Sequence, residues 1–148
     1  MVNVIHPIAG ACAMVTIATF WLSTVLSELF GSEALVVTVK TAIPWGFWVL
    51  IPALAAAGGM GFKLARGRRT GLIGAKAKRM PLIALNGILV LIPSAVFLAY
   101  KAQAGAFDAS FYVVQGLELL AGAANLTLLG LNMRDGLKMK GRLRRKPL

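Results

Sequence analysis

The sequence predicts an all-α membrane protein, a bundle of four transmembrane helices with both termini on the cytoplasmic side. Composition is the first observation behind this prediction. The 148 residues are 58% hydrophobic, and their mean hydropathy is +0.77, whereas soluble globular proteins are roughly half apolar. The second observation is that most of the sixteen Lys and Arg residues gather between and after long apolar runs. The length suits one domain, residues 1–148, so we expect lipid to cover the excess apolar surface.

Four apolar stretches are long enough to cross a hydrocarbon core of about 30 Å, which needs about 20 helical residues. They cover residues 5–29, 36–62, 81–100 and 111–133. The first has no Lys or Arg before its apolar run and exceeds the hydrophobic region of a secretory signal, so we expect a spanning helix. In the second and third stretches Pro44, Pro52 and Pro93 each remove a backbone hydrogen bond, which predicts kinks packed against neighbouring helices.

The basic residues predict the orientation of the helices. All but Lys40 and Lys101 lie in two places, the connection between the second and third stretches (Lys63, Arg66, Arg68, Arg69, Lys76, Lys78 and Arg79) and a tail over residues 134–148. Positive residues accumulate on the cytoplasmic side, so four crossings place both termini there. Beside helix ends such charges contact anionic lipid headgroups, and we expect no nucleic-acid partner.

Small and polar residues predict which helix faces pack together, because helix association in lipid depends on close approach and polar contacts. The fourth stretch carries such a stripe at 3-4 spacing: Gln115, Glu118, Gly122, Asn125, Leu129 and Asn132. The first carries His6, Ala9, Ala13, Thr16, Phe20, Ser23 and Ser27, and the second carries Ala53, Ala57 and Gly61. We expect these stripes to line the seam of the bundle. Cys12, the one cysteine, is expected to be a small buried residue.

Glu118 is the polar residue in the predicted helices that most needs a partner, because an unpaired carboxylate in a membrane costs several kcal/mol or takes up a proton. Lys40 lies at a comparable depth in the second stretch. We therefore expect a Glu118 to Lys40 ion pair that locks two helices. A proton-carrying Glu118 is the functional alternative.

His6 opens the first helix in the string HPIAG, with Gly10 one turn further along nearly the same face. The topology places it level with several methionines and with basic side chains. Imidazole and thioether are the usual axial ligands of low-spin haem, and basic side chains suit its propionates. The hypothesis is a haem b site with His6 as iron ligand, completed by a Met of this chain or by His6 of a second copy. The predicted cofactor residues are His6, Gly10, Met60, Met80, Met133, Arg79 and Arg134.

The stretches HPIAG, TFWLSTVLSELFGS, VKTAIPWG and LTLLGLNMRDGL resemble a family of small uncharacterised four-helix bacterial inner-membrane proteins with an N-terminal HPxxG motif. The resemblance implies a location in the bacterial inner membrane and a four-helix fold. It identifies no substrate and no catalytic residue. HExxH, GxSxG and phosphate-loop motifs are missing from the sequence, so we expect a protein that is not an enzyme. A lipid-modifying site made of Lys, Arg and Asn stays open.

The sequence leaves three hypotheses about function. The first is a small homo-oligomeric haem protein, a b-type cytochrome dimer in electron transport that uses His6. The second is a non-catalytic accessory or assembly subunit of a larger membrane complex. The third is a small transporter or channel, whose polar passage the stripe of Gln115, Glu118, Asn125 and Asn132 would line.

Overall fold

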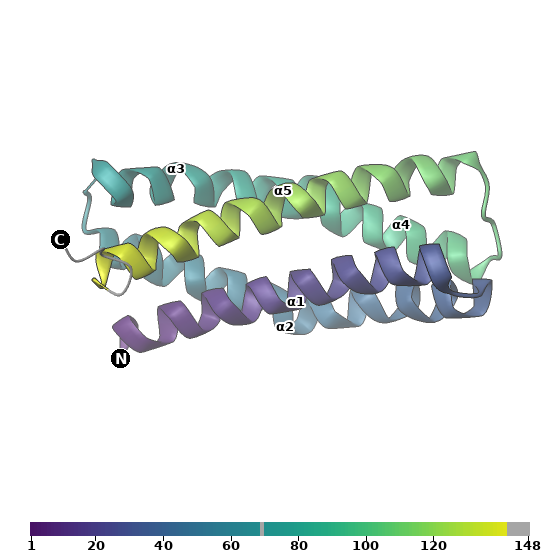
Figure 1. The fold of residues 1–148 in the computed structure, drawn as a ribbon, viewed down its shortest axis with the longest axis horizontal. Coiled ribbons are helices and arrows are strands. Elements are labelled where there is room, and N and C mark those ends of the chain that lie inside the picture. Colours follow the sequence, from purple (N-terminus) through teal and green to yellow (C-terminus); the bar gives the residue numbers. More distant parts are fainter. Residues whose placement is uncertain (69, 142–148) are drawn as a thin grey trace, which may run out of the picture.

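The computed structural model describes residues 1–68 and 70–141. Arg69 and the part of the predicted basic tail from residue 142 onward lie outside the described residues. The elements are α1 (Val2–Phe30), α2 (Glu33–Ala65), α3 (Gly71–Asn86), the π-helix η1 (Gly87–Leu91), α4 (Ile92–Gln103) and α5 (Ala109–Met139). Because α3, η1 and α4 follow one another without a break, these elements make four long rods (Figure 1). All four are long and apolar enough to cross a bilayer, which confirms that part of the prediction.

The third rod begins ten residues earlier than expected, at Gly71 instead of residue 81. The sequence suggested a loop up to Pro81 because Lys76, Lys78 and Arg79 precede it. Pro81 costs the helix one backbone hydrogen bond and does not end it. The connection between α2 and α3 is therefore short, and α2 closes at Arg66 with φ of 45°.

The other helix ends extend the predicted boundaries by smaller amounts. α1 starts at Val2, α2 at Glu33 and α5 at Ala109, and α5 runs to Met139, beyond the expected residue 133. The first residues of the predicted tail thus continue the last helix. At about 1.5 Å per residue, the 33 residues of α2 measure about 50 Å. Such a rod projects beyond a hydrocarbon core of about 30 Å or crosses it with a tilt.

The π-helix η1 lies directly before Pro93, which has no N–H to donate to the carbonyl of Leu89. Here the N–H of Ile92 bonds the Gly87 carbonyl five residues back. The irregularity expected at Pro93 is thus accompanied by a π-bulge, a feature that is frequent at functional sites.

The four rods pack in a ring, in which α1 contacts α2 and α5, and the α3 to α4 rod contacts α2 and α5. Two diagonal pairs face each other across the centre, α2 with α5 and α1 with the α3 to α4 rod. Met1, the connection between α2 and α3 and the last turn of α5 lie together, here called the terminal end (Figure 1). The connections over residues 31–32 and 104–108 lie at the opposite end.

Close helix contacts depend on glycines that accept aromatic rings. A Cβ at Gly46 of α2 would lie 2.2 Å from Cζ of Phe20 on α1. A Cβ at Gly122 of α5 would lie 2.9 Å from Cδ1 of Trp21. These glycines let α1 approach both of its neighbours. The predicted small-residue stripes do face inward, with Ala13, Ala53 and Ala57 buried, whereas Cys12 is exposed, contrary to expectation, because it lies on the outer side of α1.

Candidate functional site

One face of α5 forms a buried stripe through the whole bundle. Its buried members are Phe111, Gln115, Ala121, Gly122, Asn125, Leu129, Asn132 and Asp135, and Glu118 is 12% exposed on the same side. The predicted polar stripe of Gln115, Glu118, Asn125 and Asn132 is therefore internal. Its polar side chains bond to groups from the other rods in three clusters along the bundle.

The first cluster lies toward the opposite end and contains Lys40 and Glu118. The Lys40 ammonium donates to Oε2 of Glu118 at 2.7 Å and to Oγ1 of Thr24 at 3.3 Å. The amide of Gln115 donates to the same Glu118 oxygen at 3.2 Å. The predicted Lys40 to Glu118 pair is confirmed.

The pair crosses the centre of the bundle. Lys40 belongs to α2 and Glu118 to α5, a diagonal pair whose backbones do not approach each other in the described structure. The Lys40 side chain, 1% exposed, reaches through the core to make this contact. Glu28, in the last turn of α1, lies within electrostatic range of both groups, and its Oε1 is buried without a hydrogen-bond partner among the described residues.

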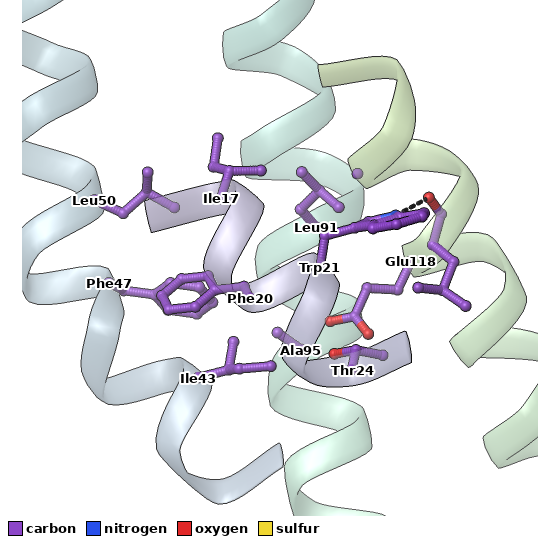
Figure 2. A pocket seen from close by; sticks show the side chains of 12 residues that line it. Ile17, Phe20, Trp21, Thr24, Ile43, Phe47, Leu50, Leu91, Ala95 and Glu118 are labelled. Carbon is purple, nitrogen blue, oxygen red and sulfur yellow. Dashed lines mark hydrogen bonds between the residues drawn. The ribbon is translucent and has the colours of Figure 1, made fainter. Parts of the chain in front are cut away.

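A small cavity of about 50 Å³ adjoins this cluster. Its walls are apolar side chains from all four rods, among them Ile17, Phe47 and Leu91. Figure 2 shows the Glu118 carboxylate and the Thr24 side chain near one another at its edge, while the Trp21 ring is held by a hydrogen bond. That bond runs from the indole nitrogen of Trp21 to the carbonyl of Leu119 at 2.9 Å.

The second cluster lies at mid-bundle, where α3 meets α5. The amide nitrogen of Asn86 donates to Oδ1 of Asn125 at 2.9 Å and to the Ala121 carbonyl at 2.8 Å. Asn125 in turn donates to the carbonyl of Ile83 at 3.3 Å. Both amides therefore have partners from the facing helix, as buried polar groups in lipid require.

The third cluster lies toward the terminal end and centres on Asp135, which is 2% exposed. Arg79 donates to Oδ2 of Asp135 at 2.6 Å, and Nε of Arg134 lies 3.5 Å from its other oxygen. Asn132 donates to the sulfur of Met80 at 3.3 Å. Lys76 lies close by, since its Nζ would be 3.4 Å from a Cβ at Gly136.

His6 lies in the seam between α1 and α2. Its Nδ1 is 2.9 Å from the carbonyl oxygen of Ala57, and its ring covers Gly61, where a Cβ would lie 3.0 Å from Cε1. A carbonyl oxygen only accepts hydrogen bonds, so Nδ1 carries the proton. In the neutral ring the lone pair is then on Nε2. Beside His6, Gly10 has open space, because a Cβ there would meet no atom within 4 Å.

The other predicted cofactor residues have separate surroundings. The Met80 sulfur accepts the bond from Asn132, and the methyl of Met80 reaches α2 beside Gly58. Met60 is half-buried, and Met133 is 39% exposed on the outside of α5. The two predicted arginines, Arg79 and Arg134, both contact Asp135. The haem site stays a prediction, with His6 as the one residue whose geometry bears on it directly.

Sequence reasoning missed several members of these clusters. Asp135 lies three residues beyond Asn132 on the buried side of α5, although strict 3-4 alternation places the next member at Gly136. Thr24 and Glu28 follow Phe20 of the α1 stripe at four-residue spacing, so an extension of the stripe along this line could have included them. Trp21 gave no sequence signal, because its hydrogen bond goes to a backbone carbonyl of α5.

No protein-family model, curated protein or solved structure matches this chain. The functional argument therefore rests on the geometry alone.

Proposed function

We propose that the protein is a non-catalytic membrane subunit, a rigid four-helix bundle that associates with a second copy of itself through the lipid-facing side of α2. The bacterial inner membrane, with both termini in the cytoplasm, is the proposed location. The basic residues Lys63, Arg66 and Arg68 at the terminal end support this orientation. The polar clusters hold the bundle together, which leaves the outer surface for association.

The observation that carries the proposal is the position of two tryptophans. Trp45 and Trp48 are 72% and 76% exposed. Trp48 adjoins the middle residue of α2 (Glu33–Ala65), and Trp45 lies about 6 Å from that middle at 1.5 Å per residue. Tryptophans that face lipid normally lie at the headgroup level, where the indole N–H finds a partner. Within the described chain neither indole N–H has one.

The surface around Trp48 offers a donor and an acceptor together. Phe47, Trp48, Ile51 and Pro52 line a groove of about 360 Å³. Pro52 has no N–H, so the Trp48 carbonyl lacks its regular helical partner. A face with one free donor and one free acceptor is complementary to itself. In a two-fold dimer each indole would donate to the carbonyl of the other copy, which satisfies groups that lipid tails leave unpaired.

Cysteine cross-linking tests this association. In a Cys12→Ser background, Ile51→Cys places a thiol in the groove, while Val113→Cys places one on the exposed face of α5 as control, since Val113 is 71% exposed. We expect a cross-linked dimer from Ile51→Cys in native membranes and none from Val113→Cys. Equal cross-linking at both positions, or none at either, would contradict the proposal.

A matched pair of substitutions tests the hydrogen bond itself. Trp48→Phe keeps the ring and removes the N–H, and we expect the dimer measured by energy transfer in vesicles to weaken by about tenfold, or about 1.4 kcal/mol. Trp45→Phe removes the same group outside the groove and should weaken the dimer less. A cross-link from position 51 to a different protein would support α2 as the interface, but it would contradict a second copy of this chain as the partner.

A second candidate function, electron transfer through haem b, is favoured by the tautomer of His6. Metal-ligating histidines usually donate their other ring nitrogen to a carbonyl or carboxylate, as Nδ1 does here to Ala57. The bond leaves Nε2 free, so His6 would hold the haem iron through this atom, together with a Met of this chain or His6 of a second copy. The test is the absorption spectrum of protein purified from haem-replete cells. A Soret band that His6→Ala abolishes supports haem ligation, and a spectrum without the band contradicts it.

A further inference from the structure

The cluster at the opposite end of the bundle contains more negative than positive charge. Glu28 and Glu118 contribute two carboxylates, and Lys40 is the one cation that interacts with them in the described structure. Its ammonium is already bonded to Glu118 and Thr24. The charged groups that face Glu28 are Lys40 of α2 and Glu118 of α5. Lys101 of α4, another cation at this end, is paired with Asp108. One negative charge is left without a counterion.

Two buried oxygen atoms in the cluster could accept a hydrogen bond from a bound proton or cation. Oε1 of Glu28 is buried and has no hydrogen-bond partner within residues 1–68 and 70–141. Oε1 of Gln115 is also buried and without a partner in that part of the chain, on a residue that is only 4% exposed. The amide of Gln115 is turned into the cluster, since its nitrogen bonds to Glu118. Both residues interact with Glu118, and each has one buried oxygen that can accept a hydrogen bond from a further donor.

We propose that this cluster binds one proton at neutral pH, held on Glu28 and exchanged with the aqueous phase at the opposite end of the bundle. A proton turns the Glu28 carboxylate into a neutral carboxyl group that can donate a hydrogen bond. A half-buried carboxylate without a counterion is thereby avoided. A metal cation fits less well, because it would lie beside the Lys40 ammonium and because Thr24 and Glu118 are already occupied.

The proposal makes a charge-balance prediction for infrared spectroscopy of the protein in vesicles. The C=O stretch of a protonated carboxyl is resolved from carboxylate bands, and wild type should show it at neutral pH. Glu28→Gln should remove it. Glu33→Gln, which changes an exposed acid at the same end, should leave it in place. Carbon-13 labelling of glutamate should shift the band in wild type, which assigns it to glutamate without any substitution.

Two further variants separate this proposal from a proton carried by Glu118. In Glu118→Gln the Lys40 ammonium is released to pair with Glu28, so the band should disappear although Glu28 is intact. In Lys40→Met both acids lose their cation, so the band should roughly double. A band that survives Glu28→Gln, or the absence of any band from wild type, would overturn the proposal. A band that is present in choline buffer and lost in sodium buffer would also overturn it, because sodium would then be the ligand.

Discussion

The Lys40 ammonium of α2 and the Glu118 carboxylate of α5 meet at 2.7 Å across the diagonal of the bundle, with Lys40 only 1% exposed. Because α2 and α5 have no close backbone contact in the described structure, the pair connects two helices that lie on opposite sides of the core. It therefore selects one order of the helices around the ring. A bundle that exchanged the positions of its helices would leave both charges in an apolar interior.

Removal of one partner of this pair should be costly, and removal of both should be tolerated. We expect Lys40→Leu to lower the free energy of unfolding by about 3–5 kcal/mol, because it leaves the Glu118 carboxylate in the bundle without its cation. Glu118→Leu should cost less, since Lys40 can turn to Glu28. The double variant should recover most of the loss. Unfolding in detergent measures the cycle, with the exposed Lys78→Leu as control, and additive single effects would contradict the pair.

The contact between Gly46 and Phe20 predicts a second effect on stability. A Cβ at Gly46 would lie 2.2 Å from the Phe20 ring, so Gly46→Ala should cost about 1–3 kcal/mol as an overpacked contact. Shortening the ring residue in Gly46→Ala with Phe20→Leu should restore part of the loss. Gly116→Ala is the control, because a Cβ there meets no neighbour. Equal thermal stability of Gly46→Ala and Gly116→Ala would show that α1 and α2 are not this close.

The mid-bundle amides should contribute a modest amount. Asn125→Leu removes the acceptor of Asn86 and the donor to the Ile83 carbonyl, which should cost about 1–2 kcal/mol for bonds between helices in lipid. Thr127→Val provides a comparison on the same helix, because Thr127 bonds only within α5. Thermal unfolding of the two variants measures the difference. A larger loss from Thr127→Val would contradict the assignment.

Asp108 gives a prediction for pH. It caps α5 by accepting from the Phe111 N–H at 3.0 Å, and the hydrogen bond from Lys101, with further bonds from Ser110 and Phe111, lowers the pKa of its carboxyl below the ordinary value. A lowered pKa means that the ionised form stabilises the fold. This contribution is complete above the ordinary aspartate pKa of about 3.9 and is lost as the pH falls further.

The matched variant for this effect is Asp108→Asn, which retains a capping side chain without the charge. We expect the melting temperature of wild type to fall more steeply below about pH 4 than that of Asp108→Asn, because only the aspartate titrates there. Melting curves recorded from pH 7 to strongly acidic conditions measure the difference. Parallel profiles for the two proteins would contradict the role of the Lys101 bond.

Much of the fold follows from the sequence, because spanning helices are set by apolar length and basic flanks. The stripe on α5 was predictable from its 3-4 spacing, and the partner of Glu118 from its depth. The start of α3 was not predictable, because Lys76 and Arg79 are typical of a loop in sequence. Only the structure shows that both interact with Asp135 of α5. The environment of His6 was also beyond prediction. Nothing in the spacing of α1 says that its ring meets the Ala57 carbonyl.

Side-specific labelling of single cysteines tests the central claim, a chain that crosses the membrane four times. In the Cys12→Ser background, Ser32→Cys and Ala104→Cys lie in the connections at the opposite end, and Thr70→Cys lies at the terminal end; all three positions are exposed. With a maleimide that does not cross membranes, we expect labelling of positions 32 and 104 from outside intact cells. Position 70 should react only after permeabilisation. Labelling of positions 32 and 70 from the same side would contradict the four-span bundle.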